Sequence, residues 1–276
     1  MRRAFEFRPF FAVDRGFTLV EMIMVIVITG ILVAMASMFG RRQIDAYIDV
    51  GNRAELADAA DTALRRIGRD LQSALPNSVR HSGNFLEFVP IADAGRYRAD
   101  TGGGAGDDPL DFASSTDSSF DVLGPTVNIA AGQQLVVFNL GQPGSDVYDG
   151  SSRRAATAGS SLSKVTFAPA GTQFPLASPQ RRFQIVGQPV TYECAANAAN
   201  PQLGTVIRRT GYGYLNPQPV VFGGSSAVLV NNVAACSFSY TPAVLQRNGL
   251  VVMRLTLSRN NESVQLLHQV DVLNTP

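Results

Sequence analysis

Glu21 is the one charged residue in the 23-residue stretch from Phe17 to Phe39, which reads FTLVEMIMVIVITGILVAMASMF. An α-helix rises about 1.5 Å per residue, so this stretch is about 35 Å long and can cross a hydrocarbon core of roughly 30 Å. A carboxylate inside an apolar segment needs a partner that neutralises it, which makes Glu21 a candidate functional group. Gly16 and Phe17 offer a second chemistry, because proteolysis between them would create a new amine at the start of the apolar segment.

The residues that flank this stretch indicate how it would be inserted. Residues 1–16 carry four arginines that would hold the N-terminus in the cytoplasm, namely Arg2, Arg3, Arg8 and Arg15. Arg41 and Arg42 on the far side weaken that charge bias. A secretory signal has a shorter apolar core, and its small cleavage residue follows that core. Because Gly16 lies before the apolar run, cleavage there would leave one membrane-spanning segment, residues 17–39, in the mature chain.

Two cysteines, Cys194 and Cys236, offer redox chemistry in the C-terminal half of the chain. A pair of cysteines in a chain that follows a membrane segment fits one disulfide in an oxidising compartment. The alternative is two buried free thiols. The disulfide would close a loop of roughly 40 residues and would contribute on the order of 4 kcal/mol in the chain-entropy model.

Acidic side chains gather in the stretch TGGGAGDDPLDFASSTDSSFD, within residues 92–121. Calcium binds several oxygen ligands on flexible loops, so Asp107, Asp108 and Asp111 are candidate Ca²⁺ ligands. Their spacing matches no EF-hand pattern. The favoured interpretation is therefore a solvated surface loop, and no cofactor is expected.

Nothing in the sequence indicates catalysis. The chain has two histidines, and neither lies beside a nucleophile motif; no G-x-S-x-G or H-E-x-x-H occurs. His268 falls on the apolar face of a terminal strand, and His81 falls in a polar turn. We therefore expect that the protein is not an enzyme.

The charge balance argues against nucleic-acid binding. Removal of residues 1–16 takes away four arginines, Glu6 and Asp14, and changes the formal net charge from +1 to −1. A negative chain opposes simple electrostatic capture of phosphates, so no nucleic-acid partner is expected. One local basic patch remains conceivable, at Arg181, Arg182, Arg208 and Arg209.

The elements that must carry these groups are a long helix and a β-rich domain. Between residues 40 and 75 apolar residues recur at steps of three and four, as on one face of a helix: Leu56, Ala60, Ala63, Leu64, Ile67, Leu71 and Leu75. Pro76 is expected to end this helix, since it donates no hydrogen bond and restricts the residue before it. No proline interrupts residues 17–75, so we expect one continuous helix.

Residues 76–276 predict an antiparallel sheet. The low charged fraction of 16 %, with 25 Gly and 15 Pro, suits a turn-rich secreted domain. Strands are expected over 84–91, 134–140, 163–169, 181–187, 189–194, 204–209, 219–222 and 233–240. Residues 92–121 and 141–161 are expected to be loops. The clearest hairpin joins 251–258 to 264–272 through Arg259–Glu262. The predicted fold class is α+β, with the second half of the helix packed on this sheet.

The residues DRGFTLVEMIMVIVITGILVAMASMF resemble the class III leader of type IV prepilins and type II secretion pseudopilins. The resemblance implies that a prepilin peptidase cuts between Gly16 and Phe17 and then methylates the amine of Phe17. It also implies that Glu21, the fifth residue after the cut, forms an assembly salt bridge with the N-terminal amine of an adjacent subunit. That pairing would neutralise the carboxylate once the helices leave lipid and pack in a filament core.

Both ends of the β-rich part carry a second resemblance. Residues 71–80, LQSALPNSVR, and the segments CSFSY and NGLVVMRLTLSRNNESVQLLHQVDVLNTP resemble the MshO family, minor pilins of the mannose-sensitive haemagglutinin (MSHA) pilus. The resemblance implies a type IV pilin fold with four parts: leader 1–16, membrane and filament-core helix 17–39, amphipathic helix 40–75 and periplasmic domain 76–276.

The same resemblance implies partners and locations. The chain would be anchored in the inner membrane by a single pass, and it would then reach the cell-surface pilus with other minor and major pilins through the inner-membrane assembly platform. As a minor pilin it would enter the initiation or tip complex, and Glu21 implies that it is not the extreme tip subunit, which in the family lacks this acid. Two alternatives stay open. One is a minor pseudopilin of a type II secretion system, because PulJ-like pseudopilins, together with PilW-like minor pilins, are the next most similar group. The other is a ligand- or DNA-binding tip subunit, such as an adhesin.

Overall fold

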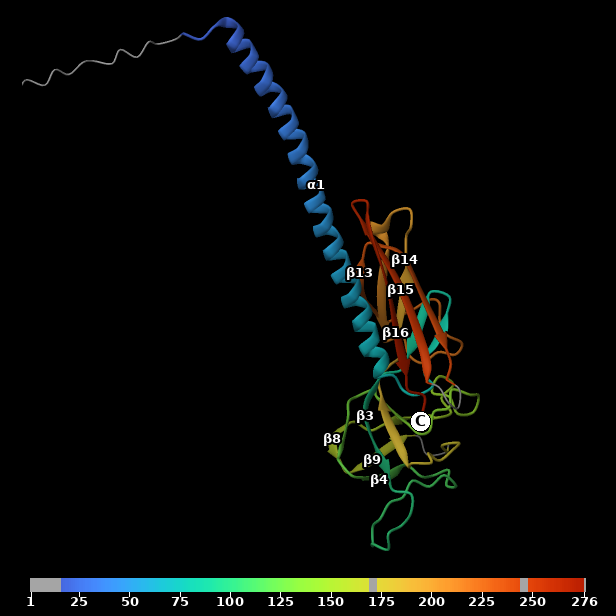
Figure 1. Ribbon diagram of the computed structural model, residues 1–276. Helices are drawn as coiled ribbons and strands as arrows, with labels where there is room; N and C mark the ends of the chain where they lie inside the picture. The colour runs from blue at the N-terminus through green and yellow to red at the C-terminus, as the bar shows by residue number, and fades with distance from the viewer. Residues whose placement is uncertain (1–15, 169–172, 244–247, 276) are drawn as a thin grey trace, which may run out of the picture. The chain divides into compact units, whose positions relative to one another are not determined.

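The computed structural model describes residues 16–168, 173–243 and 248–275, without the side chains of residues 40–42. Residues 1–15, which make up most of the predicted leader, lie outside the described residues. Contacts divide the chain into two compact units, Met1–Gly51 and Asn52–Pro276. Figure 1 shows the long helix α1, Leu19–Gln72, and a set of antiparallel sheets. The α+β class predicted from the sequence is confirmed.

Helix α1 begins where its first turn is capped. The hydroxyl oxygen of Thr18 accepts a hydrogen bond from the backbone N–H of Glu21 at 3.2 Å. Thr18 and Glu21 thus stand at the two positions of an N-terminal capping box, and the hydroxyl satisfies a donor that has no partner inside the helix. The structure therefore fixes the helix start two residues after Phe17.

The predicted end of the helix at Leu75 is wrong by three residues, because tertiary hydrogen bonds take over the backbone before Pro76. The N–H of Leu75 donates to the carbonyl oxygen of Val89 at 2.7 Å. The carbonyl oxygen of Ser73 accepts from the N–H of Ile91 at 2.8 Å. These two bonds tie residues 73–75 to residues 89–91, where Ala74 forms an isolated β-bridge with Pro90, so α1 ends at Gln72.

The remaining elements all lie in the second unit. In chain order they are β1 Arg80–Ser82, β2 Phe85–Phe88, β3 Ile91–Tyr97, β4 Ser119–Leu123, β5 Val127–Ile129, β6 Gln134–Val136, β7 Arg153–Ala156, β8 Gly159–Leu162, β9 Lys164–Ala168, β10 Arg182–Val186, β11 Val190–Ala195, the 3₁₀ helix η1 Pro201–Leu203, β12 Thr205–Thr210, β13 Ser225–Asn231, β14 Val233–Thr241, β15 Gly249–Arg259 and β16 Glu262–Val272.

The strands form two open sheets, a barrel and a small ribbon. A five-stranded sheet has the order β1-β2-β11-β12-β13, and a three-stranded sheet has the order β14-β15-β16. Strands β10-β3-β4-β9-β7-β6 close into a barrel, and β5 pairs with β8. In Figure 1 the barrel strands β3, β4 and β9 lie together, apart from β13 to β16.

The predicted apolar face of the helix forms the main core of the second unit. The seven residues named from the sequence are each 3 % exposed or less: Leu56, Ala60, Ala63, Leu64, Ile67, Leu71 and Leu75. Six of them pack with side chains from both open sheets, and Leu75 joins a smaller cluster. Gly68 allows the close approach of β16, because a Cβ there would lie 3.2 Å from Nε2 of His268.

The barrel overturns the prediction that residues 92–121 and 141–161 are loops. They contain most of β3, β4, β7 and the start of β8, whose sequences include IADAGRY and RRAA. Such strands lack the β-branched alternation that identifies strands from sequence alone. Their conformation depends instead on bulky residues from elsewhere: a Cβ on Gly95 would lie 2.7 Å from the ring of Phe183, so the barrel needs a glycine opposite that phenylalanine.

The barrel is inserted between two paired strands of the five-stranded sheet. Phe88 at the end of β2 lies opposite Val190 at the start of β11. The chain leaves and re-enters the sheet at this point, where the N–H of Gly187 donates to the carbonyl oxygen of Pro90 at 3.0 Å. A separate apolar cluster around Leu75, Val89 and Tyr148 lies at this junction.

The C-terminal hairpin is confirmed, and one predicted strand is wrong. Strands β15 and β16 pair from Gly249 and Val272 to Arg259 and Glu262. The two turn residues, Asn260 and Asn261, have φ of 53° and 65°, the left-handed conformation that a tight two-residue hairpin turn requires. Residues 219–222 form no strand. The strand follows them instead, as β13, because pairing with β12 begins at Ser225 opposite Thr210.

Candidate functional site

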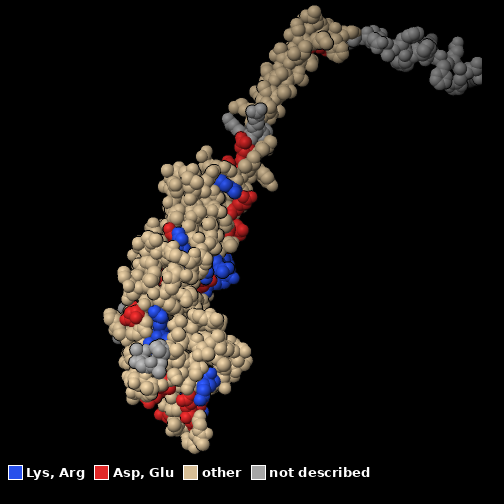
Figure 2. Space-filling view, turned by 180° about the vertical axis from the view of Figure 1, so that it is seen from behind, with Lys and Arg blue, Asp and Glu red and all other residues tan. Residues whose placement is uncertain are grey.

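The apolar segment at the start of the chain is exposed on all sides. Every large apolar side chain between Phe17 and Phe39 is between 51 % and 80 % exposed. An 18-residue window of α1 has a mean hydropathy of 2.6, and none of that window is buried within the protein. Figure 2 shows the surface of this part of the helix almost entirely without charged atoms. By length and composition the helix can cross a membrane.

The polar side chains of this segment are satisfied locally, with Glu21 as the exception. The hydroxyl of Thr29 donates to the carbonyl oxygens of Val25 and Ile26, and the hydroxyl of Ser37 donates to that of Ala34 at 3.0 Å. Among the residues that the structure describes, none pairs with the Glu21 carboxylate. The segment therefore presents one charge that requires a partner.

The predicted cleavage residues lie immediately outside the helix. Gly16 and Phe17 are exposed and have no regular secondary structure, and the capped first turn follows them. Proteolysis favours exposed backbone that is free of secondary structure, and the bond between Gly16 and Phe17 meets that condition.

Comparison with known proteins bears on this segment alone. A family model described as the prokaryotic N-terminal methylation motif matches residues 12–37. The match covers Gly16, Phe17, Glu21 and most of the apolar run. Together with the long helix and the antiparallel sheets, it supports a protein of the type IV pilin-like or pseudopilin class. The motif implies processing by a prepilin peptidase and assembly with other pilins, and the apolar helix is consistent with anchoring in the inner membrane.

No curated protein and no solved structure matched the chain in the other two comparisons. The class of protein thus rests on the motif and the fold.

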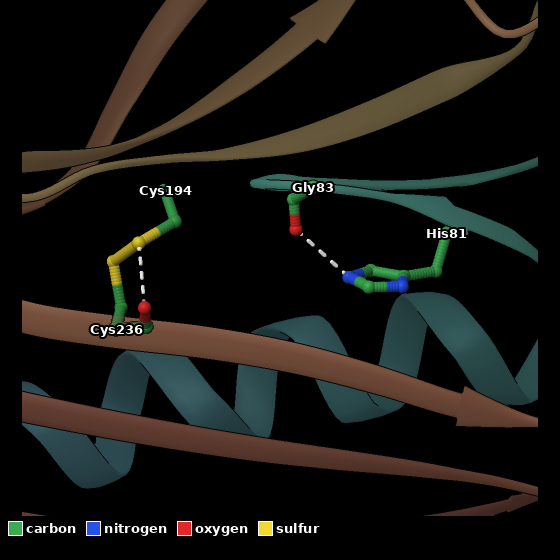
Figure 3. Close-up of a disulfide and its surroundings, with 4 residues drawn as sticks. All are labelled: His81, Gly83, Cys194 and Cys236. Atoms are coloured by element: carbon green, nitrogen blue, oxygen red, sulfur yellow. Dashed lines mark hydrogen bonds between the residues drawn. A yellow bond between two sulfur atoms is a disulfide. The ribbon is translucent and has the colours of Figure 1, made fainter.

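The two cysteines form a disulfide that joins the open sheets. Cys194 of β11 and Cys236 of β14 are bonded, with their Cα atoms 5.9 Å apart. Figure 3 shows the bridge between the two strands. The Sγ of Cys194 also lies 3.0 Å from the carbonyl oxygen of Cys236; a disulfide sulfur carries no proton, so this is a close contact and not a donated hydrogen bond. The bridge ties the five-stranded sheet to the three-stranded sheet beside the helix.

The carboxylates of the three candidate calcium ligands form hydrogen bonds and ion pairs with other groups of the protein. Asp107 accepts the N–H of Gly102 at 2.7 Å and pairs with Arg98. Asp108 accepts the hydroxyl of Ser119 and pairs with Lys164 at 3.0 Å. Asp111 accepts the N–H of Ala113 at 2.7 Å. Within the described residues, no group of three or more His, Cys, Asp or Glu side chains is placed to hold a metal ion. These carboxylates order the loop between β3 and β4.

The two histidines lie in ordinary structural surroundings. Nε2 of His81 lies 2.9 Å from the carbonyl oxygen of Gly83, to which it can donate, as Figure 3 shows. His268 lies on the helix-facing side of β16, against Gly68. Neither contact brings a nucleophile to the ring.

Sequence reasoning missed a buried ionic group on β1 and β2, at one edge of the five-stranded sheet. Glu87 is fully buried in β2, a strand whose other residues are Phe85, Leu86 and Phe88. Arg80 donates to its carboxylate at 2.6 Å, and the hydroxyl of Tyr212 donates at 2.9 Å. The guanidinium of Arg80 also lies 3.5 Å from the centre of the Tyr148 ring. Since Tyr148 belongs to the junction cluster, this group links the sheet to the barrel.

Burial dominates the electrostatics of this group. It raises the pKa of the Glu87 carboxyl, and the hydrogen bonds and charge of Arg80 oppose that rise only in part. Burial and the neighbouring Glu87 also raise the pKa of Tyr212. A single glutamate in an otherwise apolar strand was the available sequence signal, but its partners come from residues that are distant in sequence.

Proposed function

We propose that the protein is a minor pilin-like subunit that is processed between Gly16 and Phe17 and assembled into a type IV filament. The observation that carries the proposal is the match of residues 12–37 to the N-terminal methylation motif, on a segment in which every large apolar side chain from Phe17 to Phe39 is exposed. Such a surface is stable only in lipid or among other apolar helices. A filament core made of sister helices supplies the second environment.

In this proposal the chain has a structural role and no catalytic one. Leader removal creates the amine of Phe17, and Glu21 of one subunit pairs with the amine of a neighbour as the helices pack. The charge is then compensated inside an apolar bundle, where an unpaired carboxylate would be strongly unfavourable. The second unit, anchored to the periplasmic face of the inner membrane, makes the lateral contacts of the subunit.

We further propose that the filament is a pilus of the MSHA type and that the subunit enters its initiation or tip complex. The likeness of residues 71–80, 236–240 and 248–276 to MshO minor pilins supports this assignment. A PulJ-like pseudopilin of a type II secretion system is the alternative with the same chemistry. Neighbouring genes for pilus assembly or for a secretion machine distinguish the two.

A third candidate, a ligand-binding tip subunit, is favoured by the extra barrel. It adds a closed β-structure to the sheet that packs on the helix. Saturable binding of the full chain to cell-surface glycans or DNA at physiological salt would support this candidate, and the absence of such binding would rule it out.

The decisive experiment for the proposed processing is Gly16→Asp. A carboxylate in place of glycine before the bond should block the peptidase, so the chain should stay at its precursor mass. Mass spectrometry of the purified protein checks this, with Gly51→Asp, in the exposed helix outside the motif, as the matched control. A mature chain that begins at Phe17 in the Gly16→Asp variant would contradict the proposal.

A further inference from the structure

Strand β16 forms an edge of the three-stranded sheet that no described element covers. It pairs with β15 and with no other strand. Because Arg259 and Glu262 flank a two-residue turn, they form a hydrogen-bonded pair, and such pairs alternate along the hairpin. The alternate residues of β16 therefore direct their N–H and C=O groups away from β15: Ser263, Gln265, Leu267, Gln269 and Asp271.

The central part of this edge lacks the usual protection against strand addition. Edge strands are commonly protected by Lys, by other charges, by Pro or by a covering element. Residues 263–269, which read SVQLLHQ, contain no Lys, Arg, Asp, Glu or Pro. The acids Glu262 and Asp271 stand only near the two ends of the strand. The edge is thus open for seven consecutive residues.

A groove of about 490 Å³ runs between this edge and the helix. Its lining residues are Thr62, Arg65, Gly68, Arg69, Gln72 and His268. The walls carry two arginines and a histidine, and no carboxylate lines the groove. Arg65 pairs with Asp61 at 2.6 Å, whereas no described carboxylate lies within ion-pair distance of Arg69. The groove therefore favours negative charge.

The spacing of the arginines matches an extended chain. Arg65 and Arg69 are four residues apart on one helix face, about 6 Å along the axis. Alternate side chains of a β-strand point to the same side and are about 6.8 Å apart. A strand added to β16 would direct every second side chain toward the helix, as Val264, Leu266 and His268 do. Two such side chains with carboxylates would meet the two arginines.

We propose that β16 and this groove bind an extended, acidic segment of a neighbouring pilin-like subunit, which adds a strand to the sheet and pairs its carboxylates with Arg65 and Arg69. The identity of the occupant rests on the proposed function. Backbone hydrogen bonds to the free edge supply affinity, and the arginines select a segment with carboxylates at alternate positions. The surface thus selects a partner segment that is both extended and negatively charged.

The test uses the full chain in detergent micelles and a fluorescein-labelled eleven-residue peptide of alternating glutamate and threonine. The same peptide with glutamine in place of glutamate is the control ligand. Fluorescence anisotropy should show saturable binding that weakens with added salt, and the glutamine peptide should bind at least about tenfold more weakly. Equal binding of the two peptides, or no binding of the glutamate peptide, would overturn the proposal.

Two pairs of variants locate the site. Arg69→Glu should weaken peptide binding by about tenfold or more, whereas Arg66→Glu, on the same helix but paired with Asp70 outside the groove, should change it by less than about twofold. Gln265→Pro removes an outward N–H of the edge, which proline permits on an edge strand, and should weaken binding; Gln265→Ala keeps that N–H and should not. Equal effects of Arg69→Glu and Arg66→Glu would contradict the site.

The result of the peptide-binding test is independent of the result of the Gly16→Asp processing experiment. If Gly16→Asp blocks processing as expected but the wild-type chain binds no acidic peptide, the inference fails and the proposed function stands. If the peptide binds as described but Gly16→Asp is processed normally, the surface stands and the proposed function fails. If Gln265→Pro lowers the thermal midpoint, its loss of binding can come from unfolding. The comparison of Arg69→Glu with Arg66→Glu then decides whether the peptide binds in the groove.

Discussion

Two carboxylates show how differently one residue type is used in this chain. Glu21 lies on an exposed apolar helix without a described partner, and Glu87 lies in the protein interior between Arg80 and Tyr212. The first needs a partner from outside the chain, while the second has its partners within the fold. Each therefore predicts a different experiment.

For Glu21 the expected effect concerns assembly and not folding. In Glu21→Ala the segment becomes more apolar, so insertion and leader cleavage should be retained, but the partner for a neighbouring amine is lost. Incorporation into purified filaments, measured by immunoblot, should fall by about tenfold or more, as expected for loss of a buried ion pair. Asp49→Ala removes an exposed helical acid outside the apolar segment and is the matched control. Filament incorporation of Glu21→Ala at the wild-type level would exclude the salt-bridge role.

For Glu87 the expected effect is a pH dependence of stability. Its pKa is raised in the folded protein, so the folded state binds more protons than the unfolded state between the ordinary value of 4.5 and the raised value. The contribution of Glu87 to stability is then fully present below that window and is lost as pH rises through it. Thermal midpoints of the wild type and Glu87→Gln, measured from pH 4 upward, should decrease more steeply in the wild type. Parallel curves for the two proteins would refute the assignment.

At the scale of elements, the helix and the two open sheets form one core, and the disulfide joins the sheets at a second point. Cys194 and Cys236 are 42 residues apart, and closing a loop of that length lowers the entropy of the unfolded chain. The bridge should contribute about 4 kcal/mol to the free energy of unfolding.

Chemical denaturation of the Cys194→Ala/Cys236→Ala double variant tests this value. Its unfolding free energy should be lower by about 4 kcal/mol under oxidising conditions, and added reductant should shift the wild type alone. A wild type that is insensitive to reductant would show that the bridge does not stabilise the fold.

The elements also show what could be predicted from the sequence. The helix face from Leu56 to Leu71 and the β15–β16 hairpin follow from local periodicity and from the Asn260–Asn261 turn, and both are found. The barrel strands could not be predicted, because segments such as RRAA adopt the strand conformation only through partners far away in sequence. Gly95 illustrates the difficulty: it fits opposite Phe183, 88 residues later in the chain. The burial of Glu87 could not be predicted from the sequence for the same reason.

At the scale of the whole second unit, the barrel has its own core. Phe120 and Phe183 pack inside it, with ring centres 5.1 Å apart, whereas Met253 belongs to the core of the helix and open sheets. The junction cluster and the Glu87 group connect the two. Damage to one core should therefore act first on its own strands.

Phe120→Ala should lower the local stability of the barrel by about 3–5 kcal/mol through the cavity that it leaves. Hydrogen exchange followed by mass spectrometry should show faster exchange in β4, β9 and β10, with β15 and β16 close to wild type. Met253→Ala is the matched control and should show the reverse pattern. Uniform acceleration over both groups of strands in Phe120→Ala would contradict separate cores.

The insertion point of the barrel also has a kinetic consequence. Phe88 and Val190 are about a hundred residues apart in sequence, and their strands cannot pair until the chain between them has been brought together, a step that costs loop-closure entropy and slows folding. The folded barrel removes that delay, because it places Pro90 and Gly187 within hydrogen-bond distance. We therefore expect the barrel to nucleate the five-stranded sheet. The strands of the other sheet, β14, β15 and β16, which the disulfide connects to it, should then join last.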